Sequence, residues 1–509
     1  MKPLYLSGQI KQIEALNEDE IGMPSLLLME HAGMSVVEHI LNLYPGEPVT
    51  VFCGPGNNGG DGFVIARILF LMGLDVLTLV LPHESSIKDD AAVNYKILKN
   101  LQSNIKHLEP SRPLEIEWTK DRILVDCIFG TGFSRPLTGT YKIVVEEMNA
   151  SVRPIISIDI PSGVNGDTGL TMGASISADL TIALGTYKLG HFQNEGFSRK
   201  GKLFIADIGL PALAQDVFKP KALLFEGADV KMMLKAKDIA GHKYSSGKVL
   251  FFSGSKDMPG AALFNAMGAL RIGVGLVKMI VERSVWNSIT GRVPETIALT
   301  YSEDAIFGNE LTEKIVSEME KYDVLAAGSG CGESPLLRKF ICKSLEMENK
   351  IIVLDADALN LLSKEIGLLD QRGLGTKVVI TPHTGEFKRL LGDEYIGGNF
   401  VELARNFSKK HEVYTVLKGP TTIVAEPGGE VFICANGHRA MATAGSGDVL
   451  AGVVAGVLAQ VDKTAEGILE AVAIHQKAGC LAAERIHERS VLATDIADSL
   501  SAALSNMTE

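Results

Sequence analysis

The feature that most constrains this chain is a glycine-rich loop, GPGNNGGDG at Gly54 to Gly62, which follows a short apolar run and opens a helical stretch. The apolar run is Val49 to Phe52, the helical stretch is Phe63 to Met72, and a second apolar run follows at Val76 to Leu81. This order predicts a βαβ unit with parallel strands. Backbone N–H groups of such a loop can converge on an anion at the helix N-terminus. An ordinary tight turn is the alternative, and five glycines in nine residues favour the anion site.

The length and the pattern of apolar runs predict two α/β domains. A chain of 509 residues is too long for one core. The pattern changes between Pro211 and Lys237, so we place the boundary near residue 220 and expect domains at 1–220 and 221–509. Apolar runs alternate with helical stretches on both sides of it, which favours mostly parallel sheets covered by helices. The segment Thr421 to Cys434 has a Pro-Gly-Gly turn between two β-rich arms and predicts a hairpin.

Charge and cysteine usage exclude several classes of protein. The net charge of −12 argues against long-range capture of nucleic acid or anionic membrane. The first twenty residues turn acidic before an apolar stretch develops, and no run of about 18 apolar residues follows, so we expect neither export nor a membrane span. Six scattered cysteines without a C-x-x-C pair suit neither a disulfide framework nor a zinc site. A cytoplasmic protein fits these observations.

Two more glycine-rich strand ends are expected beside the first loop. They are VDCIFGTGFSRPLTG, which contains Asp126, and SIDIPSGVNGDTG, which contains Asp159. Ligands of open parallel sheets sit beyond the carboxyl ends of the strands, so both aspartates are expected to face one pocket. Either aspartate alone could instead cap a helix or brace a loop.

These three segments resemble, in order and spacing, the epimerase domain of the NAD(P)H-hydrate repair enzymes, also called the YjeF N-terminal domain, over roughly residues 1 to 215. The resemblance implies a Rossmann-like three-layer domain with Asp159 as catalytic acid/base near the substrate ring. It implies a potassium ion held by Asn58, Asp126 and Ser162, and oxygen ligands with one carboxylate suit such an ion better than zinc. Lys188 is as consistent with a solvated charge as with a site residue and is left out. The implied substrate contacts, besides Asp159, are Asn57, Asn58, Gly59, Gly60, Asp61, Gly130, Thr131, Gly132, Phe133, Ser134, Arg135 and Pro136.

The second half carries its strongest signal in NGHRAMATAGSGDVLAGVVAGVLAQ, at Asn436 to Gln460. A long apolar helix follows from Val449, so AGSG is expected to form its N-terminus, where unpaired amides and the helix dipole can stabilise a transferring phosphoryl group. Asp448 is placed to take a proton from an attacking hydroxyl. A plain helix cap by Ser446 and Asp448 is the alternative.

GSGD at the start of a glycine-spaced helix resembles the ribokinase-like superfamily and implies a ribokinase-like three-layer domain. Further segments narrow the resemblance to the ADP- or ATP-dependent NAD(P)H-hydrate dehydratases over roughly residues 225 to 509; they are LRIGVGLVK, AAGSGCG, VLDADALN, TPHTGEFKRLLG and LKGPTT. It implies that Gly275, Gly330 and His383 line the substrate site with Asp448, although His383 could simply cap the next helix. The implied nucleotide contacts are Lys418, Gly419, Pro420, Thr421, Thr422, Ala444, Gly445, Ser446 and Gly447.

Together the two resemblances imply a bifunctional repair enzyme for hydrated NADH and NADPH. The first domain would interconvert the R and S hydrates. The second would dehydrate the S form at the expense of ADP or ATP, with Mg²⁺, and potassium would belong to the epimerase site. We expect small-molecule partners, no nucleic acid or membrane, and a homo-oligomer. The alternative is a ribokinase-like small-molecule kinase fused to a non-catalytic nucleotide-binding module, and the choices between ADP and ATP and between the two hydrates stay open.

Overall fold

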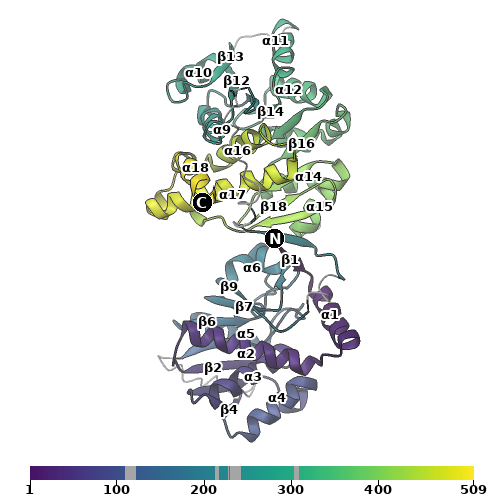
Figure 1. Cartoon of the computed structure of the whole chain (residues 1–509), viewed down its shortest axis with the longest axis vertical. Helices are drawn as coiled ribbons and strands as arrows, with labels where there is room; N and C mark the ends of the chain where they lie inside the picture. The colour runs from purple at the N-terminus through teal and green to yellow at the C-terminus, as the bar shows by residue number, and fades with distance from the viewer. Residues whose placement is uncertain are drawn as a thin grey trace. The chain divides into compact units, whose positions relative to one another are not determined.

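The chain forms two compact units, shown in the computed structural model of Figure 1. The units are Lys2–Leu223, and Leu224–Glu509 together with Met1. The structure describes residues 1–108, 122–211, 217–226, 229, 242, 244–302, 309–395 and 397–508. Most of the stretch between residues 211 and 237, where the sequence pattern changes, lies outside these residues. Among the helices described, none has both the length and the apolar character needed to cross a bilayer.

The described part of the N-terminal unit is built on a seven-stranded parallel sheet. Its order from edge to edge is β4 (Asn104–His107), β3 (Val76–Val80), β2 (Val49–Cys53), β5 (Ile123–Cys127), β6 (Ile155–Ile158), β7 (Leu180–Leu184) and β9 (Lys202–Ala206). The chain builds outward from β2 in one direction, then returns to β5 and builds in the other. The order therefore reverses between β2 and β5, which is where open α/β sheets bind ligands.

Helices cover both faces of this sheet because alternate strand residues point to opposite sides. Val49, Val51 and Cys53 of β2 join a core with α2, α3 and α4, whereas Phe52 joins a core with α5 on the other face. The unit's helices are α1 (Ser7–Leu16), α2 (Ser25–Leu43), α3 (Asn57–Leu71), α4 (Asp89–Asn100), α5 (Gly139–Ala150) and α6 (Asn194–Arg199). A short parallel pair, β1 (Lys2–Tyr5) with β8 (Tyr187–Lys188), completes it. This is the expected three-layer, Rossmann-like arrangement.

Close backbone approach explains the glycines after β2. A Cβ atom on Gly54 would lie 1.7 Å from the carbonyl oxygen of Ile128, and one on Gly62 would lie 2.8 Å from the side chains of Cys53 and Cys127. Both distances are too short for real contacts, so the loops after β2 and β5 meet, and α3 lies directly on the sheet, only with glycine at these positions.

The C-terminal unit is a second three-layer α/β domain. Its strands run in the order β13 (Ile297–Tyr301), β12 (Leu276–Glu282), β11 (Lys248–Phe252), β14 (Val324–Ala327), β15 (Ile351–Leu354), β16 (Lys377–Ile380), β17 (Tyr414–Leu417), β18 (Thr422–Ala425) and β19 (Val431–Cys434). The pairs from β13 to β17 are parallel, and β18 and β19 form the expected antiparallel hairpin. β10 (Ala222–Phe225) contains the boundary between the units.

A buried central helix organises the C-terminal unit. α16 (Ser446–Leu458) is apolar on all sides after its first turn, as a helix inside a core must be. It approaches α9 (Pro259–Arg271) so closely that a Cβ on Gly268 would lie 2.5 Å from the Val449 carbonyl oxygen, and one on Gly452 would lie 2.3 Å from that of Asn265. The other helices are α10 (Arg283–Ile289), α11 (Asn309–Met319), α12 (Pro335–Glu346), α13 (Asp357–Lys364), α14 (Thr384–Leu391), α15 (Phe400–His411), α17 (Thr464–Arg485) and α18 (Ala493–Thr508).

Candidate functional site

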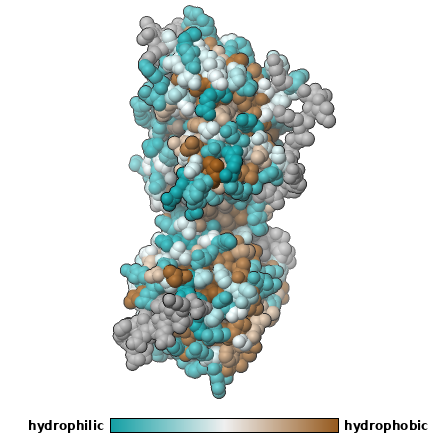
Figure 2. All heavy atoms as spheres, turned by 90° about the vertical axis from the view of Figure 1, so that its left-hand side faces the viewer, coloured by the Kyte–Doolittle hydropathy of each residue, from teal (hydrophilic) through white to brown (hydrophobic). Residues whose placement is uncertain are grey.

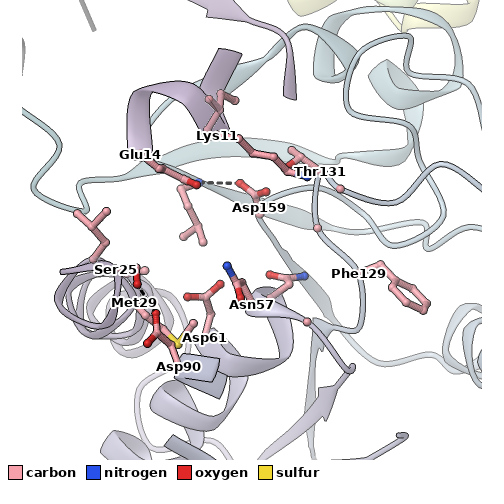
Figure 3. A pocket seen from close by; sticks show the side chains of 18 of the residues that line it. Lys11, Glu14, Ser25, Met29, Asn57, Asp61, Asp90, Phe129, Thr131 and Asp159 are labelled. Carbon is pink, nitrogen blue, oxygen red and sulfur yellow. Dashed lines mark hydrogen bonds between the residues drawn. The ribbon is translucent and has the colours of Figure 1, made fainter. Parts of the chain in front are cut away.

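A cavity of about 400 Å³ lies at the carboxyl edge of the N-terminal sheet, at the point where the strand order reverses (Figure 3). Side chains from α1, α2 and the first turns of α3 form one part of its wall, and the segments after β5 and β6 form another. The cavity is lined by Ile10, Lys11, Glu14, Ser25, Leu28, Met29, Ala32, Pro55, Gly56, Asn57, Asn58, Asp61, Asp90, Ile128, Phe129, Gly130, Thr131, Gly132, Phe133, Asp159, Leu184, Lys188 and Ile208.

Eight of the predicted substrate contacts line this cavity: Asn57, Asn58, Asp61, Gly130, Thr131, Gly132, Phe133 and Asp159. Five do not: Gly59, Gly60, Ser134, Arg135 and Pro136. Gly59 and Gly60 instead allow close packing of the chain. A Cβ on Gly59 would lie 2.0 Å from the Gly54 carbonyl oxygen, and one on Gly60 would lie 2.7 Å from the Met29 side chain. Part of the glycine motif therefore serves close packing of the loop.

Asp159 is the most constrained residue of the cavity. It follows β6 in a left-handed backbone conformation, with φ of 71°, which non-glycine residues adopt rarely and mostly at functional sites. Its carboxylate Oδ1 forms an ion pair with the Nζ of Lys188 and accepts a hydrogen bond from the Leu184 amide at 3.3 Å. The Lys188 Nζ also donates to the Leu184 carbonyl at 2.8 Å.

Lys188 is only 1% exposed and lines the cavity, so the interpretation of Lys188 as a solvated charge is wrong. A lysine at the end of a two-residue strand gives no sequence signal of burial. Removing both charges of a pair from water is costly, and the cost is offset only by close geometry and further hydrogen bonds. Lys188 has both in its contacts with Asp159 and Leu184. The structure thus turns Asp159 and Lys188 into one charged unit at the cavity wall.

The buried His191 holds the Asp159–Lys188 pair through hydrogen bonds to the backbone of both residues. The Lys188 amide donates to its Nδ1 at 3.2 Å, so Nε2 must carry the proton, and Nε2 lies 2.9 Å from the Asp159 carbonyl oxygen. Burial lowers the pKa of His191 to about 3, with the positive charge of Lys188 adding to the effect, so the ring is neutral at physiological pH. A neutral donor holds the Asp159 backbone without adding a second positive charge.

Of the three other carboxyl groups that line the cavity with Asp159, two have raised pKa values. Burial, and then the charges of Asp159 and Glu14, raise the pKa of Asp61 well above its usual range. Burial, and then Asp159, also raise the pKa of Glu14, although Lys188 and Lys11 lower it. Carboxyl groups biased toward the protonated form, close to an ion-paired carboxylate, equip the cavity for proton transfer.

The predicted cation ligands cluster beneath the cavity. Asp126 is fully buried and does not line it, which corrects the expectation that this aspartate faces the pocket. Its carboxylate instead accepts hydrogen bonds from the Ser162 hydroxyl at 2.6 Å, the Ser157 hydroxyl at 2.8 Å and the Ser162 and Ile128 amides. Burial raises the pKa of Asp126 although these hydrogen bonds lower it. No lysine or arginine in the described residues pairs with it.

Asn58 supplies an unsatisfied oxygen close by. Its side-chain oxygen and nitrogen are both buried without a hydrogen-bond partner in the described structure. A Cβ on Gly130 would lie 3.4 Å from the Asn58 Cβ, and the neighbouring Phe129 amide donates to the Ser162 hydroxyl at 2.8 Å. Asn58 and the Asp126–Ser162 pair therefore border the consecutive residues Gly130 and Phe129, respectively. A buried carboxylate without a cation, next to an orphaned amide oxygen, fits a site for a hard cation.

The C-terminal unit places Asp448 in the first turn of α16. Gly445, which precedes the helix, has φ of 86°, and a Cβ there would lie 2.6 Å from the Phe264 ring. The turn therefore requires glycine, and the first amides of a helix lack intrahelical partners. The Asn265 side chain donates to the Asp448 carbonyl at 2.8 Å and fixes the turn to α9. Burial, and then Asp355, raise the pKa of Asp448 to about 6, although Lys418 lowers it.

Asp355, which acts on the pKa of Asp448, accepts hydrogen bonds from three side chains. It follows β15, is 3% exposed, and accepts hydrogen bonds from the Lys418 Nζ at 2.8 Å, the Thr381 hydroxyl at 2.7 Å and the Ser329 hydroxyl at 3.2 Å. These donors follow β17, β16 and β14, so one carboxylate ties four strand ends together. Although burial lowers the pKa of Lys418, Asp355 and the other carboxylates around it raise the value overall, so Lys418 stays charged.

The predicted nucleotide segments meet at Lys418. A Cβ on Gly447 would lie 3.2 Å from the Lys418 Nζ, so the loop after β17 faces the turn that opens α16. Gly419, Pro420, Thr421 and Thr422 lead from Lys418 into β18, and Ala444, Gly445 and Ser446 lead into Gly447. An ammonium group beside free helix amides is an arrangement suited to phosphate.

The three remaining predicted substrate contacts of the C-terminal unit, Gly330, His383 and Gly275, do not lie together. Gly330 follows β14, and a Cβ there would lie 2.6 Å from the Ala261 Cβ, so it packs against the start of α9. His383 is 54% exposed and accepts hydrogen bonds from the Gly385 and Glu386 amides, so it caps α14 while its ring stays accessible. Gly275 lies apart. Its amide bonds to the Ser246 and Gly247 carbonyls at the amino ends of β11 and β12, one strand length, roughly 16 Å, from the carboxyl edge.

Sequence reasoning missed several polar residues of both sites. Asp355 carries the same signal as Asp159, an aspartate directly after a buried strand, and could have been found. Lys188, Ser329 and Thr381 carry no such signal because only the tertiary structure brings them to an aspartate.

Comparison with known proteins places both halves of the chain. Residues 249–502 match the family described as NAD(P)H-hydrate dehydratase, and residues 25–190 match the family described as YjeF-related protein N-terminus. The chain is 34% identical to the bifunctional NAD(P)H-hydrate repair enzyme Nnr of Moorella thermoacetica, with 99% of this chain and 97% of that protein covered. It is also 34% identical to the protein of the same name from Thermofilum pendens, with 94% and 91% covered.

Solved structures resemble the C-terminal half. A ribokinase-like superfamily protein from Enterococcus faecalis matches with a TM-score of 0.50 and 25% identity over 56% of this chain and 96% of that chain. An ADP/ATP-dependent NAD(P)H-hydrate dehydratase from Bacillus subtilis, crystallised with ATP and Mg²⁺, matches with a TM-score of 0.48 and 26% identity over 56% and 99%. The first match, with the strand order above, confirms the ribokinase-like fold.

The pair of Asp159 and Lys188 can be tested without any assay of activity. Replacing Lys188 by Met should lower the free energy of unfolding of the N-terminal unit by about 3–5 kcal/mol, because it leaves a buried carboxylate without its partner. Denaturant unfolding followed by circular dichroism measures this. The double variant Lys188→Met with Asp159→Asn should recover most of the loss, and Lys96→Met on the exposed face of α4 is the control. An unchanged unfolding curve for Lys188→Met would contradict the pair.

Proposed function

Since this chain belongs to the family of bifunctional NAD(P)H-hydrate repair enzymes, we propose that each of its two units carries one repair reaction. The N-terminal unit, at residues 1–220, interconverts the R and S hydrates of NADH and NADPH. The C-terminal unit, at residues 221–509, dehydrates the S hydrate at the expense of ADP or ATP. The products are NADH or NADPH, phosphate, and AMP or ADP.

One observation carries the proposal. Each unit holds an ionisable aspartate at the carboxyl edge of its sheet, beside a lysine that the fold has drawn out of the bulk solvent. In the N-terminal unit the two are Asp159 and Lys188, and in the C-terminal unit they are Asp448 and Lys418. A non-catalytic binding module has no need for a strained, ion-paired aspartate in its cavity. This argues against the alternative of a kinase fused to an inert module.

Epimerisation needs a proton carrier at the hydrated carbon. The hydroxyl on carbon 6 must leave with a proton and water must return from the other face, giving its proton up again. Asp159 reaches the cavity and is held in place by Lys188 and by the neutral His191. It is therefore positioned to take the proton from the returning water. The apolar wall formed by Leu28, Met29 and Ile208 limits access of other water.

Dehydration by phosphoryl transfer follows from the C-terminal geometry. Asp448 takes the proton from the hydroxyl of the S hydrate while that oxygen attacks the terminal phosphorus of the nucleotide, and the bond from phosphorus to the bridging oxygen breaks. The first amides of α16 and the Lys418 ammonium stabilise the charge of the transferring group. Phosphate then leaves carbon 6 with the electron pair of the carbon–oxygen bond, carbon 5 loses a proton to solvent, and the double bond between carbons 5 and 6 is restored. When bound, Mg²⁺ would neutralise charge on the nucleotide phosphates.

A potassium ion belongs to the epimerase in this proposal. Asn58 would offer its unsatisfied oxygen, Asp126 its buried charge and Ser162 its hydroxyl oxygen. The ion would balance the charge of Asp126 and so keep the loop after β5 in place. In the described residues no three His, Cys, Asp or Glu side chains gather as candidate metal ligands.

We also expect a homo-oligomer in the cytoplasm, where nucleotide substrates are found. Leu26, Leu27 and Met34 of α2 are 37%, 47% and 56% exposed, and the face drawn in Figure 2 shows apolar patches among hydrophilic side chains. Exposed apolar side chains on neighbouring turns of one helix favour contact with a second subunit.

The two activities should fail differently when their aspartates are replaced by the isosteric Asn. Asp448→Asn should slow the repair of both hydrates by about 10²–10⁴-fold, because the general base is lost, while the R and S forms still interconvert. Asp159→Asn should repair the S form at nearly the normal rate. On a mixed pool it should show a fast phase equal in amplitude to the S fraction, then a slow phase limited by spontaneous epimerisation. Absorbance of the reduced nicotinamide follows both.

Either outcome can refute one half of the proposal. If Asp159→Asn consumes the whole pool in one fast phase, the N-terminal unit is not the epimerase. If Asp448→Asn repairs the S hydrate at the normal rate, Asp448 is not the base.

The pKa of Asp448 predicts an acid limb in the dehydration rate. A base with a pKa of about 6 is protonated and inactive below that pH, so kcat/KM should fall toward tenfold per pH unit below 6 and level off above it. Nucleotide phosphates titrate in the same range. Asp355→Asn separates the two, because removing a carboxylate that raises the pKa of Asp448 should move the limb to lower pH. If the acid limb of kcat/KM does not move in Asp355→Asn, the group that titrates is a phosphate of the nucleotide and not Asp448.

Potassium should stabilise the N-terminal unit as well as activate it. Thermal unfolding should shift to higher temperature in potassium relative to tetramethylammonium, because an ion that binds only the folded state stabilises it. Asn58→Leu, which keeps the bulk and removes the oxygen, should abolish the shift, and epimerisation should follow the same ion dependence. Equal unfolding temperatures and equal epimerisation rates in potassium and tetramethylammonium would contradict the proposed potassium site.

A further inference from the structure

α1 brings a lysine to the cavity from outside the glycine-rich motifs. Ile10, Lys11 and Glu14 of this helix line the cavity, and α1 precedes residues 25–190, which carry the family match. The helix is held at its first turn, where the Ser7 amide and hydroxyl donate to the Asp167 carboxylate at 2.6 and 2.7 Å. Ile10 and Ile13 pack with Tyr5 in a small buried cluster. The position of Lys11 is therefore set by the fold.

The cavity is otherwise acidic. Its ionisable lining consists of four carboxyl groups, Glu14, Asp61, Asp90 and Asp159, and two lysines, Lys11 and Lys188. Lys188 is already occupied by Asp159. Among the described residues Lys11 forms no ion pair, so its ammonium group is available to an anionic ligand. The other group in the cavity that favours an anion is the N-terminus of α3, and an anionic ligand away from both would face the carboxyl groups.

Lys11 also reaches the glycine segment after β5. A Cβ on Gly132 would lie 3.5 Å from the Lys11 Nζ, and Figure 3 shows the side chain extending toward Thr131. Gly130, Thr131 and Gly132 expose backbone to the cavity at this point. A lysine ammonium over a glycine-lined backbone segment is a common arrangement for binding phosphate.

We propose that Lys11 is a substrate-binding residue of the epimerase site and that it binds the pyrophosphate of the hydrated dinucleotide over residues 130–132. The inference rests on the proposed epimerase function. The pyrophosphate then lies at the α1 side of the cavity, and the ring lies deeper, at Asp159. Lys11 contacts a part of the substrate that does not react, so it contributes equally to binding of the ground state and of the transition state.

Kinetics of the full-length protein test this placement. With pure R hydrate and saturating nucleotide, Lys11→Gln should raise the KM of epimerisation about tenfold, as expected for a lost hydrogen bond to a charged group, with kcat within about twofold. Lys11→Glu should raise it further, and Lys11→Arg should stay close to the wild type. Lys96→Gln, on the exposed surface of α4 and away from the cavity, is the matched control and should change neither constant. An unchanged KM in both Lys11→Gln and Lys11→Glu would overturn the inference.

Chemical labelling separates this inference from the proposed function. Limited acetylation with acetic anhydride, followed by mass spectrometry, measures the accessibility of the Lys11 Nζ itself. ADP-ribose, which carries the pyrophosphate without the hydrated ring, should slow acetylation of Lys11 several-fold, whereas adenosine should not, and Lys96 should react equally in every sample. Equal labelling of Lys11 with and without ADP-ribose overturns the inference even if the protein epimerises hydrates. Protection of Lys11 in a protein without epimerase activity would overturn the proposed function and leave the phosphate site intact.

Discussion

Charge buried at the carboxyl edge of a parallel sheet governs both halves of this protein. A carboxylate removed from water is unstable unless a cation, a set of hydrogen-bond donors or a proton compensates it. Asp159 is compensated by Lys188, Asp355 by Lys418 and two hydroxyl groups, and Asp126 by serine hydroxyl and amide donors. Asp61 and Asp448 have less compensation, and the pKa of each is raised accordingly. The two aspartates proposed to move protons therefore differ: Asp159 is ion-paired with Lys188, whereas burial raises the pKa of Asp448 to about 6.

This constraint requires the backbone around each carboxylate to be placed accurately, and the glycines provide that. The loops after β2 and β5 touch at Gly54, α3 lies on the sheet at Gly62, and α16 meets α9 at Gly268 and Gly452. Each contact leaves no room for a side chain. Many of the 52 glycines therefore act at a distance from substrate, by bringing strand ends and helix starts close enough for a few polar side chains to meet.

The residues of the two sites differ because the two proposed reactions require different groups. The epimerase cavity is walled by helices and contains several carboxyl groups, which suits proton transfer without a second substrate. The dehydratase residues surround a helix N-terminus and a lysine, which suits a reaction that moves a phosphoryl group. In the proposed scheme the dehydratase takes only the S hydrate, and a linked epimerase makes the R hydrate available as well. This accounts for two unrelated folds in one chain.

Much of this could be predicted from the sequence, because it depends on local pattern. Buried parallel strands appear as short apolar runs, so β2 and β3 were predicted to within one residue at their ends. The edge strands β4 and β13 carry a weaker signal because their residues are partly or fully exposed. The glycine loops, the fold class, the hairpin and the aspartates proposed as catalytic carry their own local signals. Gly275 misled, because a glycine motif does not reveal at which end of its strand it lies.

The partners of those aspartates were decided only by the tertiary structure. Lys188 lies 29 residues beyond Asp159, and Lys418 lies 63 residues beyond Asp355. No local pattern distinguishes a buried lysine from a solvated one, since its burial depends on which chain segments fold over it. The burial of Asp126 beneath the cavity and the entry of Lys11 from α1 have the same origin. The sequence by itself determined which residue types stand at the strand ends. Packing between distant segments determined which charges lose water, and hence which of them acquire the pKa values and the partners that chemistry requires.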